Sequence, residues 1–140
     1  MTVLDAYAVI AYLRGGEAAS GQVRELLRAP TVLSAVNAAE VIDQLVRIDG
    51  NDPDEVEIRL ATLEVGGMMI APATHSQAVA AGSLRARHYN RRTCAVSLAD
   101  CFAAATALDH GGSLATSDPH LSALVQAEAG TVHYLPEVSG

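Results

Sequence analysis

The stretch Thr2-Val3-Leu4-Asp5-Ala6-Tyr7-Ala8 opens with a short apolar run and places an acidic residue directly after it. If Val3 and Leu4 form a buried strand, Asp5 lies at the carboxyl end of that strand. Open α/β sheets bind their ligands at this edge. Burying an unpaired carboxylate costs on the order of several kcal/mol, so Asp5 is the first candidate for a functional side chain. Asp is also a preferred helix N-cap, which leaves a structural interpretation open.

Further along the chain, apolar runs of strand length alternate with longer helical patterns. Alternation of this kind predicts βαβ units and a mainly parallel sheet. We expect strands at 3–4, 31–35, 68–71, 113–116 and 132–135. We expect helices at 7–13, 20–28, 36–48, 53–66, 74–88 and 97–110, and a last short helix from Pro119. These elements predict one three-layer α/β/α domain over residues 1–140, with a central, mainly parallel five-stranded sheet.

The composition narrows the classes of function. No apolar run approaches the roughly 18 residues that span a bilayer, and the start of the chain lacks the pattern of a signal peptide. We therefore expect a cytoplasmic protein without a membrane partner. A net charge of −7 argues against binding nucleic acid by bulk electrostatics. Bound divalent cations would reverse the charge at a local site, so an enzyme that acts on nucleic acid is still compatible.

Three more acids, Glu40, Asp100 and Asp118, lie in apolar or small-residue surroundings. In the expected fold, Asp118 follows a strand, while Glu40 and Asp100 fall in the first two turns of their helices. The carboxyl ends of parallel strands and the amino ends of the following helices share one edge of the sheet. Together with Asp5, these residues, called the four acids below, are expected on that edge. Converging carboxylates need a cation, which predicts a divalent metal site.

Each acid also has a structural explanation in its local sequence. Asp118 precedes Pro119 and has the form of an N-cap. The stretch Ser97-Leu98-Ala99-Asp100 matches a capping box. Glu40 lies inside a helix, where an ordinary solvated face is the alternative. Asp43, three residues further on the same side of that helix, is a candidate additional acid of the site.

Taken in order, four segments resemble those of the PIN-domain nucleases, and more closely those of the VapC family of toxin ribonucleases from prokaryotic toxin–antitoxin pairs. The segments are Val3 to Ile10, Ser34 to Glu40, Ser97 to Cys101 and Leu114 to Pro119. The resemblance spans almost the whole chain, and the length is typical of that family.

The resemblance implies that the four acids form a pocket that binds Mg²⁺ or Mn²⁺ and hydrolyses RNA phosphodiesters. Such hard cations prefer oxygen ligands, lower the pKa of a bound water and neutralise charge on a phosphate. The resemblance also implies that the Thr116 hydroxyl supports the pocket, that a small antitoxin protein covers it, and that the protein forms a homodimer. Many relatives carry Ser or Thr two residues after the first Asp, where this chain has Tyr7.

A phosphate substrate also needs positive contacts. All nine basic residues are arginine, which suits bidentate binding of phosphate. The only dense basic stretch consists of Arg85, Arg87, His88, Arg91 and Arg92, just before the segment that carries Asp100. Solvation of a loop or pairing with surface acids is the open alternative for this stretch. Arg14, near the end of the first helix, is a further candidate.

Two other enzyme classes with acids and Mg²⁺ at the same edge are disfavoured. Proteins of the receiver-domain family require a lysine at their site, and the chain has no lysine. Haloacid-dehalogenase-like phosphatases carry a D-x-D motif, and Tyr7 stands where its second Asp would be. The alternative function from a different class is a non-catalytic acidic α/β module that binds a basic protein partner. Binding of Mn²⁺ discriminates between that module and a nuclease.

Overall fold

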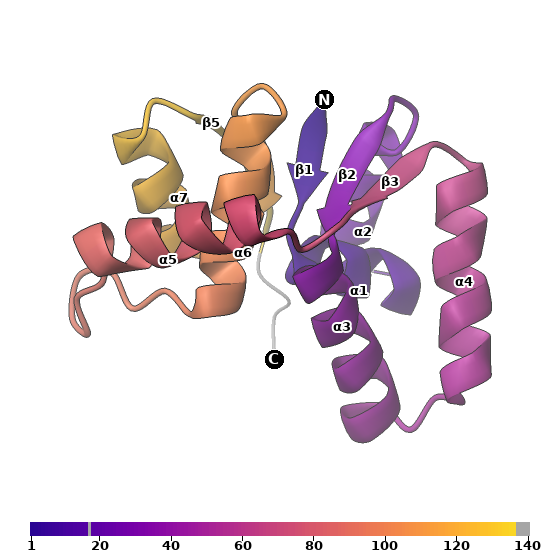
Figure 1. Ribbon diagram of the computed structural model, residues 1–140. Coiled ribbons are helices and arrows are strands. Elements are labelled where there is room, and N and C mark those ends of the chain that lie inside the picture. The colour runs from indigo at the N-terminus through magenta and orange to yellow at the C-terminus, as the bar shows by residue number, and fades with distance from the viewer. Residues whose placement is uncertain (17, 137–140) are drawn as a thin grey trace.

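The computed structural model describes residues 1–16 and 18–136. Five strands form one sheet in which every pairing is parallel, in the order β3-β2-β1-β4-β5 (Figure 1). Their bounds are β1 (Thr2–Leu4), β2 (Thr31–Ser34), β3 (Met68–Ala71), β4 (Ser113–Thr116) and β5 (Thr131–Tyr134). The five-stranded parallel sheet that the sequence predicts is confirmed, and each strand begins and ends within one residue of its expected position.

Seven α-helices surround the sheet in the described part of the chain. They are α1 (Ala6–Arg14), α2 (Ala18–Leu26), α3 (Ala35–Asp43), α4 (Pro53–Val65), α5 (His75–His88), α6 (Leu98–Asp109) and α7 (Pro119–Ala127). None of these helices is both long and apolar enough to cross a membrane.

The local sequence accounts for where the helices begin. Asp52 caps α4 by accepting from the backbone N–H groups of the first turn, and Pro53 takes the first helical position, where no N–H is needed. Thr74 caps α5 in the same way. Ser97 and Asp100 form the complete capping box that the sequence predicts for α6.

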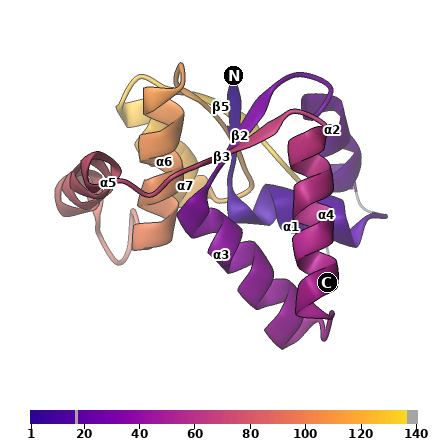
Figure 2. The same ribbon diagram turned by 45° about the vertical axis from the view of Figure 1, so that its right-hand side comes forward.

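The strands are apolar on both faces because helices cover both sides of the sheet. Leu4 belongs to an apolar cluster with side chains of α1, α2, α3 and α4, whereas its neighbour Val3 belongs to a second cluster that includes side chains of α6 and α7, and both side chains are fully buried. Figure 2 shows the two helical layers on opposite sides of the sheet, with α5 packed on the outside of α6. The predicted three-layer α/β/α architecture is therefore confirmed.

The helix predicted for 36–48 divides in two. It begins as α3 and continues as one π-helical turn, η1 (Gln44–Ile48). The N–H of Asp49 donates to the carbonyl of Gln44, five residues earlier, at 3.2 Å. Gly50, with φ +76°, then lets the chain turn back, and the Asn51 amide nitrogen Nδ2 donates to the Leu45 carbonyl at 3.0 Å. Single π turns of this kind are frequent at functional sites.

Strand β1 lies at the centre of the sheet, and the chain order reverses around it. From β1 the chain passes outward to β2 and β3, and then crosses to β4 and β5 on the other side (Figure 1). The N–H of Asp5 donates to the Ala115 carbonyl of β4 at 3.2 Å, so Asp5 lies at the point where the order switches. In open α/β sheets, the crevice at such a point is the usual place for a ligand.

Candidate active site

A cavity of about 310 Å³ opens at the carboxyl edge of the sheet, and all four acids line it. Each acid comes from a different part of the fold. Asp5 joins β1 to α1, Glu40 lies in α3, Asp100 lies in the first turn of α6, and Asp118 joins β4 to α7. We call this cavity the acidic pocket. The structure thus brings together side chains that are separated by more than 100 residues in the sequence.

Asp5 is the most buried of the four acids, with 7% of its surface exposed. Its Oδ1 accepts a hydrogen bond from the Ala8 N–H at 2.8 Å, so the side chain caps α1 and also lines the pocket. The pKa of Asp5 is raised to about 7, chiefly by burial, and the neighbouring Asp100 and Glu40 carboxylates contribute to the rise. Hydrogen bonds from the Thr116 hydroxyl and from Ala8 act in the opposite direction. The sequence offered two interpretations of Asp5, as a helix cap and as a pocket residue. Its side chain does both.

Glu40 is half-buried and held by Asn37, one turn earlier in α3. The Asn37 Nδ2 donates to Glu40 Oε1 at 2.8 Å and to the Ala99 carbonyl of α6 at 3.1 Å. Asn37 is itself 1% exposed, and the Ser34 hydroxyl donates to its Oδ1 at 2.6 Å. Burial raises the pKa of Glu40, the Asn37 hydrogen bond lowers it, and the nearby Asp100 carboxylate raises it.

Asp100 combines helix capping with a place in the acidic pocket. Its Oδ2 accepts from the Ser97 N–H at 2.9 Å, while the Asp100 N–H donates to the Ser97 hydroxyl at 3.0 Å. Burial raises the pKa of Asp100, the Ser97 N–H lowers it, and the Asp118 carboxylate raises it. Ser97 therefore holds the Asp100 carboxylate in one orientation at the pocket.

Asp118 caps α7 through Oδ1, which accepts from the N–H groups of His120 at 2.8 Å and Leu121 at 3.3 Å. Its own N–H donates to the Thr116 hydroxyl at 3.0 Å. Thr116 is fully buried at the end of β4 and touches two acids, because the same hydroxyl also hydrogen-bonds to Asp5. The local geometry leaves Asp118 Oδ2 outside the capping bonds.

The donor set of the pocket suits a hard divalent cation. The four acids supply only oxygen, and the described residues that line the cavity include neither His nor Cys. Asp5 is buried among like charges and forms no ion pair with any described residue. Among residues 1–16 and 18–136, however, no three Asp, Glu, His or Cys side chains are already grouped closely enough to hold a metal.

Some candidates from the sequence lie elsewhere. Asp43 is exposed and forms two hydrogen bonds with Arg47, one turn later, so it does not line the acidic pocket. The Arg47 guanidinium lowers the pKa of Asp43. Although a spacing of three residues puts Asp43 on the same side of the helix as Glu40, Asp43 is the last residue of α3, and its carboxylate is exposed and paired with Arg47.

The basic stretch before α6 does not line the acidic pocket either. The Arg85 Nε donates to the Val96 carbonyl at 3.0 Å, and its guanidinium stacks 4.2 Å from the centre of the Tyr89 ring. Arg87 forms an ion pair with Glu128. Arg91 and Arg92 are exposed in the turn that precedes α6. Two of the four arginines thus form contacts within the fold. The clustering of arginines in the sequence could not reveal these contacts.

Two polar residues of the site are absent from the expectations made from sequence. Asn37 and Gln44 lie three residues before and four residues after Glu40, and Gln44 also lines the pocket. Side chains at these spacings share one face of a helix. This spacing was the available signal, because polar residues that share a face with a buried acid are candidates to hold it.

The comparisons with known proteins agree with this fold. The structure is similar to VapC20 of Mycobacterium tuberculosis, described as a sarcin-ricin loop cleaving toxin, with a TM-score of 0.71 and 22% identity over 97% of this chain and 100% of that one. It is similar to FitAcB of Neisseria gonorrhoeae, with a TM-score of 0.68 and 24% identity over 94% and 96% of the two chains. A toxin–antitoxin complex from Klebsiella pneumoniae gives 0.67 and 20% over 88% and 91%.

The sequence itself points to the same family. No curated protein matches the chain significantly in sequence. The profile of the PIN domain matches residues 2–126, a range that contains all four acids and every strand except β5. The chain therefore belongs to the PIN-domain family.

Proposed function

We propose that this protein is a metal-dependent endoribonuclease and the toxin of a toxin–antitoxin pair. The observation that carries the proposal is the acidic pocket, in which carboxyl groups from four separate elements face one cavity. Membership of the PIN-domain family supports it. So do two of the similar structures, which are described as a sarcin-ricin loop cleaving toxin and a toxin–antitoxin complex.

In this proposal Asp5, Glu40 and Asp100 hold Mg²⁺ or Mn²⁺, directly or through water, and Asp118 completes the pocket. When bound, the cation supplies activation of water and neutralisation of charge on the phosphate. Asp5 must lose its proton to serve as a ligand, because a ligating carboxyl group must be ionised. With a pKa of about 7, Asp5 is partly protonated near neutral pH before a cation binds.

The remaining residues of the site hold these ligands in place. Asn37 orients the Glu40 carboxylate and ties α3 to the helix that carries Asp100. The Thr116 hydroxyl hydrogen-bonds to the Asp5 carboxyl group and to the backbone N–H of Asp118, so one side chain holds two of the acids near each other. Residues that hold metal ligands are often nearly as important as the ligands themselves. The pocket is thus supported on one side of β1 by Asn37 of α3, which follows β2, and on the other side by Thr116 of β4.

The proposal includes a protein partner and a second copy of the chain. A small antitoxin with a basic segment would complement the acidic pocket and the net charge of −7. The Klebsiella pneumoniae structure described above is a toxin–antitoxin complex, which supports a partner of this class. We propose that the protein also forms a homodimer and acts in the cytoplasm on RNA, as a single domain.

The test is cleavage of RNA by the purified protein in the presence and absence of Mg²⁺ or Mn²⁺. We expect Asp5→Asn to abolish cleavage and to weaken Mn²⁺ binding while leaving the fold intact, because Asn keeps the cap of α1. Asp43→Asn is the matched control, since this acid lies on the helix of Glu40 but outside the pocket.

Unchanged cleavage by Asp5→Asn contradicts the assignment of the site. Failure of both the wild type and Asp5→Asn to bind Mn²⁺ favours the non-catalytic acidic module instead. Mapping of RNA ends after expression of the chain without its antitoxin then identifies the substrate.

A further inference from the structure

The acidic pocket contains one positively charged side chain among its described lining residues, Arg14. Tyr7, Ile10 and Arg14 succeed one another at intervals of three and four residues and line the same wall. This spacing places them on one face of α1, which starts at the Asp5 cap. An RNA strand carries a phosphate at every nucleotide, so a wall that extends from the four acids to a guanidinium can contact more than one phosphate.

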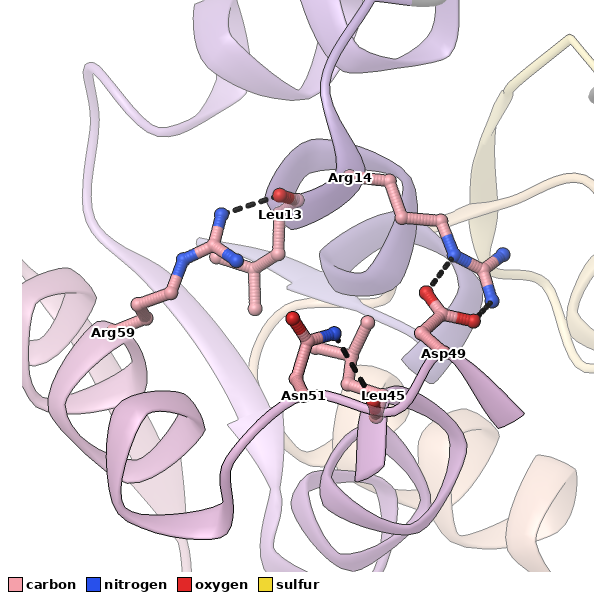
Figure 3. Close-up of polar contacts among 6 residues, drawn as sticks. All are labelled: Leu13, Arg14, Leu45, Asp49, Asn51 and Arg59. Atoms are coloured by element: carbon pink, nitrogen blue, oxygen red, sulfur yellow. Dashed lines mark hydrogen bonds and ion pairs between the residues drawn. The ribbon is translucent and has the colours of Figure 1, made fainter. Parts of the chain in front are cut away.

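Arg14 is held in a fixed orientation by Asp49, just after the π turn η1. The Arg14 Nε donates to Asp49 Oδ2 at 2.7 Å and its Nη2 donates to Asp49 Oδ1 at 2.8 Å (Figure 3). This bidentate pair lowers the pKa of Asp49. Guanidinium groups that are held in this way lose less conformational entropy when they bind a ligand.

The backbone beneath this pair is also secured from α4 and from the loop after η1. Figure 3 shows the Arg59 guanidinium donating to the Leu13 carbonyl at the end of α1, and the Asn51 amide donating to the Leu45 carbonyl. The end of α1 and the turn that carries Asp49 are therefore fixed relative to each other. Arg14 is presented by a rigid support rather than by a free surface loop.

The ion pair leaves one edge of the Arg14 guanidinium available. Asp49 occupies the Nε and Nη2 edge, and the Nη1 and Nη2 edge makes no hydrogen bond with a described residue. The Arg14 side chain is 40% exposed, so this edge can be reached by a ligand in the pocket. A guanidinium edge with two parallel N–H groups matches two oxygens of a phosphate.

We propose that Arg14 binds an RNA backbone phosphate adjacent to the phosphate that is cleaved at the four acids. This inference rests on the proposed function and adds a substrate contact to it. Asp5 and Arg14 are nine residues apart (14 − 5) at opposite ends of α1. At a rise of about 1.5 Å per residue their backbones are separated by about 13 Å along the helix axis, and because both side chains line the same cavity, the Arg14 guanidinium can contact a nucleotide near the one at the four acids.

The chain contains a matched control for this contact. Arg47 forms the same bidentate pair with Asp43, through Nε at 3.0 Å and Nη2 at 2.9 Å, but it does not line the acidic pocket. Arg14→Gln and Arg47→Gln therefore remove the same charge and the same type of ion pair. They differ in whether that arginine faces the pocket.

The experiment measures binding of a short, fluorescein-labelled single-stranded RNA by anisotropy, in Mg²⁺ buffer at several salt concentrations. The protein carries Asp5→Asn, so that the RNA stays intact. We expect Arg14→Gln to weaken binding about tenfold, as for loss of one charged hydrogen-bonded contact. We expect the slope of log K against log salt to fall by about 0.7, the value for one phosphate contact on a single strand. Arg47→Gln should change neither quantity.

Equal affinity and equal salt slope for Arg14→Gln and Arg47→Gln overturn the inference, whereas metal-dependent cleavage by the wild type would leave the proposed function standing. Absence of cleavage by the wild type overturns both. If Arg14→Gln does not stay folded at the assay temperature, the RNA affinity of Arg14→Lys is measured instead. Lysine keeps the charge but cannot bridge two phosphate oxygens, so an unchanged affinity in that variant contradicts the bidentate contact that the free guanidinium edge is proposed to make.

Discussion

The side-chain amide of Asn37 donates to the Glu40 carboxylate at 2.8 Å and connects this acid to the backbone of α6. One buried amide thus fixes the distance between the helix that carries Glu40 and the helix that carries Asp100. A metal site assembled from separate elements depends on such links, because each ligand must stay close to its productive position.

We expect Asn37→Ala to impair the site more than the fold. The variant removes the donor to Glu40 and to the Ala99 carbonyl, which lowers the free energy of unfolding by about 1–3 kcal/mol. It should also reduce Mn²⁺ affinity or RNA cleavage by about 10-fold to 100-fold. Urea unfolding, calorimetry and cleavage assays measure these effects.

Thr106→Val is the control for Asn37→Ala. Thr106 is buried in α6 and its hydroxyl donates to the Phe102 carbonyl at 2.7 Å, away from the acidic pocket. This variant should lose stability but keep its cleavage rate. A proportional loss of stability and activity in both variants would show that Asn37 serves the fold alone.

The stability of the metal-free protein should fall as the pH rises from about 4 to about 7. Folded Asp5 has a pKa of about 7, against an ordinary pKa of 3.8 for an aspartate side chain. Between these values the folded state retains a proton that the unfolded state has lost, so the free energy of unfolding decreases with pH. The decrease attributable to Asp5 is at most about 4 kcal/mol, from roughly three pKa units.

Asp5→Asn isolates this contribution, because the amide keeps the cap but does not ionise. The variant should match the wild type near pH 4 and be more stable near pH 8 when EDTA is present. Added Mg²⁺ should stabilise the wild type at pH 8 and leave the variant unchanged. Parallel stability curves for the two proteins across this range of pH would rule out a buried, titrating Asp5.

Thr116→Val should shift the pH dependence of the site. The Thr116 hydroxyl lowers the pKa of Asp5, so its removal raises that pKa. The midpoint of Mn²⁺ binding or cleavage should then move to higher pH, whereas Thr116→Ser should restore it. A lower rate with an unchanged midpoint would indicate that Thr116 acts only through the Asp118 backbone.

Asp118 can be compared with Asp52, because each residue caps a helix and precedes a proline. Replacing either with Ala should lower stability by about 1 kcal/mol, since a capping side chain is lost. Replacing either with Asn should preserve stability. We expect only Asp118→Asn to weaken Mn²⁺ binding in calorimetry, because Asp52 lies outside the acidic pocket. Equal Mn²⁺ affinity in the two Asn variants would limit Asp118 to its role as a cap.

The parts of the structure that could be predicted from sequence are those determined locally. Strand β1 is apolar on both faces, and caps such as Asp52 and Ser97 lie next to the helices that they begin. Once the strands were assigned as parallel, the edge shared by the four acids followed from topology. The place of each acid in the pocket was therefore accessible without coordinates.

The features that escaped prediction depend on distant partners or on small changes in backbone geometry. Arg87 pairs with Glu128, 41 residues later, which no local pattern indicates. The π turn η1 contains Leu45 and Val46, whose apolar side chains fit an ordinary helix equally well. The dense arginine stretch does not line the pocket in the described part of the chain, whereas Arg14, the further candidate from the sequence, does.

The reversal of strand order around β1 divides the acidic pocket between two contiguous segments of the chain. Residues 1–71 form β1, β2 and β3 and contribute Asp5 and Glu40, while the segment after 71 contributes Asp100 and Asp118. A nascent chain that has emerged only as far as β3 therefore carries half of the pocket and should have no activity during synthesis. Two separately expressed fragments divided after Ala71 should likewise be harmless alone and become toxic only when they associate.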